Sequence, residues 1–224
     1  MKKIGSILSW TVTGIAIAIV ILIAVLFALD GDGDISKLTW TEEMIEEYEK
    51  YPEEFRVEYI KAYEDERTFT EDGYFSVSKS RYIPALSQWQ FTIRYNHSTL
   101  RYLSEERGEE MAVEDDHFTF ALVDDKGNVY RDFEYKKETK GRYTYYRLVF
   151  DSVNIKKVDD IQIMIYCIAD IEGEELPKIA VGKLPLYYSV FERKDYKFKK
   201  ELPEDMKPTE GFTSGDELLK GKTK

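Results

Sequence analysis

The sequence predicts a mainly β protein, an antiparallel β-sandwich ectodomain preceded by a single N-terminal transmembrane helix and a short amphipathic helix. Three observations support this prediction. Residues 4–29 carry no charge. Several later segments alternate apolar and polar residues with a period of two. Turns that contain glycine separate those segments. The chain has 224 residues, a length that suits one or two domains.

The predicted transmembrane helix covers residues 7–29 and follows a short N-terminus at residues 1–6. Such a helix extends about 34 Å at ~1.5 Å per residue, enough to cross the hydrocarbon core of a bilayer. A cleaved secretory signal is the alternative, but it has a shorter apolar region and a small-x-small cleavage site. The exit here reads Phe27-Ala-Leu-Asp30 without such a site. We therefore expect an uncleaved anchor, with the lipid bilayer as the partner of residues 7–29.

The charges that flank this span predict its orientation. Lys2 and Lys3 precede it, whereas Asp30, Asp32 and Asp34 follow it. Because cytoplasmic flanks carry the excess of lysine and arginine, we expect a cytoplasmic N-terminus. The sequence therefore predicts a cell-membrane protein whose C-terminal domain is extracellular.

Residues 30–52 are predicted to form a linker that contains the short amphipathic helix. Thr39-Trp-Thr-Glu42 has capping-box spacing, and Met44, Ile45 and Tyr48 form an apolar helical stripe. We expect a helix from about residue 41 to residue 50, ending near Pro52.

Residues 53–200 are predicted to form the sandwich. The alternating or β-branched segments are 55–60, 89–95, 118–122, 129–135, 142–150, 161–167, 178–188 and 196–198. Residues 124–128 and 138–141 have the composition of hairpin turns. Many short strands with few helices indicate a two-layer antiparallel arrangement. The tail at 201–224 has few apolar residues and is predicted to be disordered.

Residues 118–130, 146–150 and 161–165 together resemble immunoglobulin-like β-sandwich domains of unknown function on Gram-positive membrane-anchored proteins and lipoproteins. The resemblance implies an immunoglobulin-like fold and a location at the cell envelope. It implies no activity and no site residues. The chain departs from the lipoprotein form because no cysteine stands directly at the end of the apolar span.

Composition excludes several classes of function. The formal net charge is −11, which disfavours binding to nucleic acid. Cys167 lies in the alternating row of segment 161–167 and is interpreted as a buried, inert thiol. The run at 114–117 holds ligand-type side chains, but adjacent strand residues point to opposite faces, so it is interpreted as a solvated strand entry. We expect no metal, no cofactor and no enzymatic activity; a carboxylate-based hydrolase remains the enzymatic alternative.

Aromatic and basic side chains supply the candidate interaction surface. Its predicted members are Tyr143, Tyr145, Tyr187, Lys194, Lys197 and Lys199. Exposed aromatic rings can stack on sugars or anchor a protein, but they can equally belong to the core. Lysines on a terminal strand can bind anionic groups or discourage strand pairing. The predicted function is a non-enzymatic binding or envelope-assembly module for an unknown protein partner. A carbohydrate- or wall-polymer-binding domain is the alternative.

Overall fold

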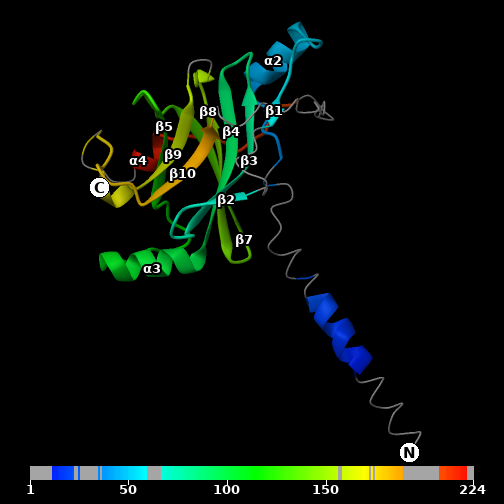
Figure 1. Ribbon diagram of the computed structural model, residues 1–224, viewed down its shortest axis with the longest axis vertical. Coiled ribbons are helices and arrows are strands. Elements are labelled where there is room, and N and C mark those ends of the chain that lie inside the picture. Colours follow the sequence, from blue (N-terminus) through cyan, green and yellow to red (C-terminus); the bar gives the residue numbers. More distant parts are fainter. Residues whose placement is uncertain are drawn as a thin grey trace, which may run out of the picture.

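The body of the protein is built from two antiparallel β-sheets that face each other (Figure 1). The computed structural model describes residues 12–22, 25, 35, 37–59, 67–155, 158–171, 173, 175–188 and 207–220. The prediction of a mainly β chain with antiparallel layers is confirmed.

The helices and strands lie in the following chain order. They are α2 (Glu42–Lys50), β1 (Glu58–Tyr59), β2 (Arg67–Phe69), β3 (Phe75–Ile83), β4 (Gln88–Asn96), α3 (His97–Arg107), β5 (Phe118–Asp124), β6 (Val129–Tyr130), β7 (Phe133–Lys140), β8 (Tyr143–Phe150), β9 (Asp160–Cys167), the short 3-10 helix η3 (Ile168–Asp170), β10 (Gly182–Tyr188), β11 (Thr213–Ser214) and α4 (Glu217–Lys220).

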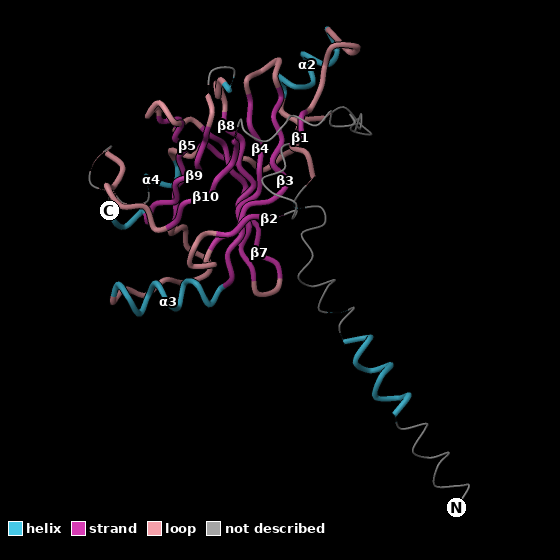
Figure 2. The backbone as a smooth tube through the Cα atoms, viewed as in Figure 1, coloured by secondary structure: helices cyan, strands magenta, loops and turns pink. Residues whose placement is uncertain are grey.

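In the described residues, the larger sheet has the order β1-β3-β4-β8-β7-β11, with β2 also paired to β3, and the smaller has the order β10-β9-β5-β6. We call them the large sheet and the small sheet. Figure 2 shows the strands gathered in the body and the helices at its periphery. Helix α3 leads from β4 in the large sheet to β5 in the small sheet.

The core lies between the two sheets and is rich in aromatic rings. In β4, Trp89, Phe91 and Ile93 are buried in it, as their alternation predicts. Phe118 and Phe120 of β5 face them from the small sheet. A core of this kind supplies most of the favourable free energy of folding, because removal of apolar surface from water is the strongest force that drives folding.

Strand β3 contains a bulge that the sequence analysis did not predict. The register with β4 shifts between Ser78 and Arg81, and Lys79 has a left-handed φ of 54°. A bulge adds one residue to one strand of a pair. Both Val77 and Tyr82 therefore face the core, although an odd and an even position cannot share a face in regular alternation. This break explains why the period-two pattern is absent from this segment.

A second apolar cluster covers part of the outer face of the large sheet. Trp40, Met44 and Phe55 belong to it. Below the cluster, the Thr39 backbone N–H donates to Gln90 Oε1 at 2.9 Å, and Gln90 Nε2 donates to the Thr39 carbonyl at 2.8 Å. The segment before α2 is thereby hydrogen-bonded to the middle of the large sheet.

Helix α2 confirms the predicted short helix, but its N-terminal cap differs from the expected one. The Thr41 side chain accepts the Met44 backbone N–H at 3.3 Å. Thr39, the expected cap, instead contacts the sheet through Gln90 and Arg147. Tertiary hydrogen bonds therefore move the cap two residues along the chain.

The prediction of a disordered tail is wrong for residues 207–220, which form β11 and α4. Leu218 is buried in the main core. Gly215 is required beside it, because a Cβ there would lie 2.6 Å from the Phe133 ring. Farther back, the Thr209 backbone N–H donates to the Trp40 carbonyl at 2.8 Å, and the Trp40 N–H donates to Thr209 Oγ1 at 3.0 Å. A few apolar anchors and main-chain hydrogen bonds thus order a segment of polar composition.

Residues 12–22 and 25 of the predicted transmembrane span are helical, and their isoleucines and valines are exposed. The rest of the span lies outside the described residues. Within the described part of the chain, no helix has both the length and the apolarity that a bilayer crossing requires.

Candidate functional site

The structure describes the side chains of two of the six predicted surface residues, Tyr143 and Tyr145. Tyr143 is half-buried on the outer face of the large sheet, whereas Tyr145 is fully buried at 0% exposure. Tyr145 therefore cannot offer its ring to a partner, and its place in the predicted surface is corrected. Tyr187 pairs with Ile161 through its backbone, but its side chain lies outside the described residues. Lys194, Lys197 and Lys199 also lie outside them.

The acidic run at 114–117 contributes Asp116 to a polar cluster with residues of β7 and β8. Asp116 accepts a hydrogen bond from the Tyr146 hydroxyl at 3.0 Å and one from the Tyr135 hydroxyl at 3.4 Å. Lys137 Nζ lies 3.3 Å from Asp116 Oδ1 and donates to the Asp115 carbonyl at 2.6 Å. We call Asp116, Tyr135, Lys137 and Tyr146 the Asp116 cluster.

The Asp116 cluster is built for structure rather than for acid–base chemistry. Burial raises the pKa of Tyr146 well above 10, with Asp116 adding to the shift. It raises the pKa of Tyr135 to about 12. A tyrosine that acts as a base or nucleophile needs a lowered pKa. These phenols instead stay protonated and donate hydrogen bonds to the carboxylate.

Cys167 is buried, as its place in the alternating row predicts. The side chain is 3% exposed at the end of β9, and burial raises the pKa of its thiol. A reactive cysteine needs the opposite, an electropositive and accessible position. In the described residues, no group of three or more histidine, cysteine, aspartate or glutamate side chains is arranged to hold a metal ion.

Two carboxyl groups with raised pKa values lie at the other end of the large sheet. Burial raises the pKa of Asp151, and nearby Asp132 adds to the shift. Burial also raises the pKa of Glu134, with Asp151 as the next cause. A hydrolase needs one such protonated acid. Asp151 Oδ1, however, accepts a hydrogen bond from Gln88 Nε2 at 2.9 Å, which gives it a structural role in the sheet.

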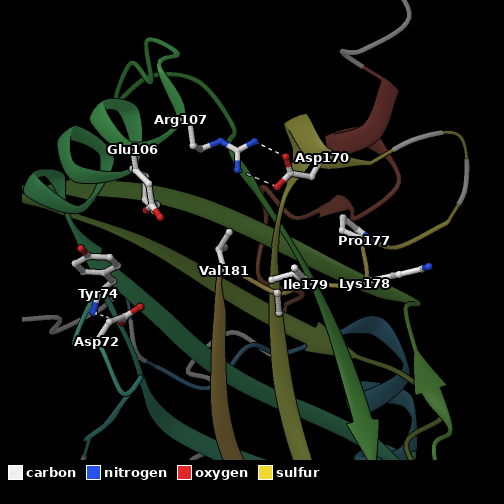
Figure 3. A pocket seen from close by; sticks show the side chains of 11 residues that line it. Asp72, Tyr74, Glu106, Arg107, Asp170, Pro177, Lys178, Ile179 and Val181 are labelled. Carbon is white, nitrogen blue, oxygen red and sulfur yellow. Dashed lines mark hydrogen bonds and ion pairs between the residues drawn. The ribbon is translucent and has the colours of Figure 1, made fainter.

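The feature best suited to recognition is an open groove of about 700 Å³ beside α3. The turn after β2, the C-terminal half of α3, η3 and the segment before β10 form its walls (Figure 3). Its lining residues are Asp72, Tyr74, Leu103, Glu106, Arg107, Asp170, Pro177, Lys178, Ile179, Ala180 and Val181. We call this feature the α3 groove.

A close approach of the two sheets positions one wall of the α3 groove. A Cβ added to Gly182 would lie 3.1 Å from the Phe75 ring and 3.2 Å from Thr70 Cγ2. Glycine therefore lets β10 approach the turn that carries Asp72 and Tyr74. In that turn, the Tyr74 backbone N–H donates to Asp72 Oδ1 at 2.9 Å. The turn and the segment before β10 are brought together by packing, which a linear pattern does not reveal.

Helix α3 positions the opposite wall. Its N-terminal cap is Asn96, whose side chain accepts the Ser98 backbone N–H at 2.9 Å, and it ends at Gly108 with a left-handed φ of 67°. Asparagine is a favoured N-cap residue, and Asn96 with Gly108 at the other end is a signal that could have predicted the helix.

An ion pair links α3 to η3 at one end of the α3 groove (Figure 3). Arg107 Nη1 donates to Asp170 Oδ2 at 2.9 Å, and Arg107 Nη2 donates to Asp170 Oδ1. This two-point contact raises the pKa of the Arg107 guanidinium. Bidentate pairs of this type give geometric definition as well as attraction, so α3 and η3 are held in a defined relation.

The walls of the α3 groove also expose apolar and aromatic surface. Ile179 is 80% exposed, beside the partly exposed Val181. The Tyr74 ring stacks on Tyr102, with ring centroids 6.1 Å apart and planes at 9°. Exposed apolar side chains gathered near polar groups are typical of binding sites. None of these residues was in the predicted surface, because α3 and the turn at 70–75 were not predicted.

Comparison of the chain with protein-family models, with curated proteins and with solved structures finds no match.

Proposed function

We propose that the protein is a single-pass, membrane-anchored, extracytoplasmic binding module that holds a protein partner in the α3 groove. The observation that supports this most is the groove itself, where the exposed Ile179 lies among charged side chains. The proposal includes an immunoglobulin-like sandwich, a cytoplasmic N-terminus and a non-enzymatic role.

The uncharged leading segment supports the anchor. Residues 4–29 contain no charged side chain, and Lys2 and Lys3 precede them. The described helical residues 12–22 expose their apolar side chains. A helix that is apolar all round and packs on no core is suited to lipid.

The composition of the α3 groove supports protein recognition. An apolar centre with a polar rim is the usual anatomy of a protein interface. Ile179 and Pro177 supply the apolar part, while Glu106 and Lys178 supply charges of opposite sign. The charge of Arg107 is already balanced by Asp170. The groove therefore presents side chains of both signs rather than a strongly cationic surface, which suits a partner of mixed charge.

Crosslinking in the cell envelope tests this function on the full chain. A photoreactive side chain replaces Lys178, which is exposed in the α3 groove, or Lys126, which is exposed at the turn after β5. We expect a specific adduct from position 178, none from position 126, and loss of the adduct when Ile179→Asp is added. Equal adducts from both positions would contradict the proposal.

A carbohydrate ligand is the second candidate, and the stacked tyrosines favour it. Tyr102 is 47% exposed beside Tyr74, and aromatic faces of this kind can stack on sugar rings. Tyr102→Leu would then abolish binding to a glycan array, whereas Tyr51→Leu would not, because Tyr51 is 52% exposed at the end of the distant α2. Glycan binding that survives Tyr102→Leu would exclude stacking on Tyr102, and the absence of binding to any glycan would exclude this candidate.

A further inference from the structure

The chain that leads from the proposed anchor joins the body on the outer face of the large sheet. Arg147 of β8 donates from Nη2 to the Lys37 carbonyl at 3.2 Å and to Thr39 Oγ1 at 3.1 Å. Arg147 faces outward, because Tyr146 and Leu148 on either side of it belong to the core. The segment at residues 37–39 is thus fixed to this face.

The same face carries a cationic and aromatic patch. Arg94 of β4 places its guanidinium carbon 4.1 Å from the centroid of the Tyr143 ring. The guanidinium of Arg142, in the turn before β8, lies 5.4 Å from the same centroid. Tyr143 and Arg94 are half-buried and Arg142 is exposed. We call these three residues the Tyr143 patch.

The charge of this face contrasts with that of the chain. At the end of the sheet that carries the Tyr143 patch, outward positions hold Arg94 and Lys140, with Arg142 in the turn, against Glu138, whereas Arg81 and Arg147 farther along are each 7% exposed. The chain as a whole has a net charge of −11. A basic face on an acidic protein creates a local potential that attracts anionic surfaces.

The length of the linker brings this face close to the bilayer. Residues 30–36 lie between the predicted span and Lys37, and an extended chain of this length reaches about 25 Å at most. Tyr143 lies four residues before Arg147 on β8, roughly 13 Å along the strand. Headgroups are therefore within reach of the patch, and arginine beside tyrosine is a combination that suits the membrane interface.

We propose that the end of the outer face that carries the Tyr143 patch lies against the membrane and that the patch binds the headgroups of anionic lipids. The inference rests on the proposed membrane anchor. Its consequence is an orientation: with this face toward the lipid, the α3 groove on the side of the small sheet and α3 remains open to partners. Salt weakens the contact, because exposed charges are screened over about 10 Å at 0.1 M ionic strength.

Spin labelling of the full chain in lipid nanodiscs tests the orientation. The label is attached to Thr139→Cys, exposed at the end of β7 one residue before Lys140, which pairs with Tyr143, or to Lys126→Cys at the turn after β5. The native Cys167 is buried and its thiol pKa is raised, so it competes little for the reagent. Discs contain phosphatidylcholine alone or with phosphatidylglycerol, and nickel held on chelating lipids broadens nearby labels.

We expect broadening at Thr139→Cys but not at Lys126→Cys, and only in discs that contain phosphatidylglycerol. Arg94→Gln and Arg142→Gln should each reduce the preference for the bound orientation roughly five-fold, the effect of one cation near an anionic surface. Arg142→Gln lies in an exposed turn and serves as the test if Arg94→Gln alters the circular dichroism spectrum. Equal broadening at both positions, or broadening unchanged by Arg142→Gln, overturns the orientation.

The two proposals fail in different ways. A chain that does not enter the discs at all refutes the anchor, and the orientation with it. A chain that enters but shows no dependence on phosphatidylglycerol refutes only the orientation. If soluble polyphosphate shifts the spectrum at Thr139→Cys in discs of phosphatidylcholine, the patch binds an anionic polymer instead, and the lipid assignment is wrong.

Discussion

The Asp116 cluster and the α3 groove are built from the same kinds of residue, yet they differ in what those residues contact. In the cluster, Tyr146 and Lys137 converge on a single carboxylate. In the groove, Tyr74, Glu106 and Lys178 border open space. The first arrangement satisfies buried polar groups internally. The second leaves polar and apolar surface for another molecule.

Burial decides which of the two roles such residues take. A buried phenol without a partner lowers the free energy of unfolding, so Tyr146 needs Asp116. Exposure of Ile179 has little effect on the free energy of unfolding of the isolated protein. Its burial by a partner contributes favourable free energy of binding. One stretch of chain, residues 103–116, contributes to both regions: it supplies Arg107 to the α3 groove and Asp116 to the Asp116 cluster. The comparison therefore predicts large stability effects in the cluster and small ones in the groove.

The largest expected effect is alkaline unfolding through the buried tyrosines. The pKa of Tyr95 and of Tyr135 is raised from 10 to about 12 in the folded state, chiefly by burial. Groups with a raised folded pKa stabilise the protein fully below the unfolded pKa, and this contribution is lost as pH rises through the folded value. We expect the urea midpoint to be stable up to pH 10 and to fall steeply between pH 10 and 12. A constant midpoint across that range would contradict burial of these phenols.

The next largest effect is expected from Asp116→Ala. The substitution leaves the Tyr146 hydroxyl buried without its acceptor and removes the ion pair with Lys137. The free energy of unfolding should fall by about 1–3 kcal/mol, measured by urea unfolding. Asp115→Ala is the matched control: Asp115 contacts Lys137 through its backbone carbonyl, so its change should stay within ~0.5 kcal/mol. Equal losses for the two variants would contradict the cluster.

A smaller effect of opposite sign is expected from Asp151→Asn. Burial raises the pKa of Asp151, so the charged form at neutral pH is disfavoured in the folded state. Asparagine keeps an acceptor for Gln88 and removes the charge near Asp132. The free energy of unfolding at pH 7 should rise by less than about 1 kcal/mol, because solvent screens a partly exposed group. This gain should vanish below pH 3.8, where the wild-type carboxyl is also protonated. Thermal unfolding at pH 7 and below pH 3.8 measures this gain in stability. Equal gains at both pH values would contradict the explanation.

The smallest effect on stability is expected from Ile179→Ser in the α3 groove. Ile179 is 80% exposed, so the free energy of unfolding should change by no more than ~0.5 kcal/mol. Crosslinking of a partner from position 178 should nevertheless decrease. A decrease in the free energy of unfolding several-fold larger than this, measured with urea, would show that Ile179 belongs to the folded core rather than to a binding surface.

Period-two patterning was sufficient to predict most of the strands. The rows at 89–95 and 161–167 became β4 and β9 because each alternating apolar row is buried in the core between the sheets. The same rule failed at β3, where the bulge at Lys79 breaks the alternation. It also failed in the tail, where Leu218 alone supplies the buried anchor of α4.

The candidate site was harder to predict than the fold. Tyr143 and Tyr145 share a face, but burial of Tyr145 depends on what covers the sheet, which alternation does not reveal. The α3 groove joins residues from 72 to 181. Its formation depends on the close approach at Gly182, a long-range packing event with no local signature. Sequence patterns identify faces, whereas grooves arise where distant elements meet.

The reciprocal hydrogen bonds between Trp40 and Thr209 carry a mechanical consequence. They join the segment that enters the body to the segment that ends it. Tension on the N-terminal side would therefore load this contact and the Gln90 bonds of Thr39 before it reached the inter-sheet core. A tethered domain with this arrangement could lose its terminal segments under force while the sandwich between them stayed intact.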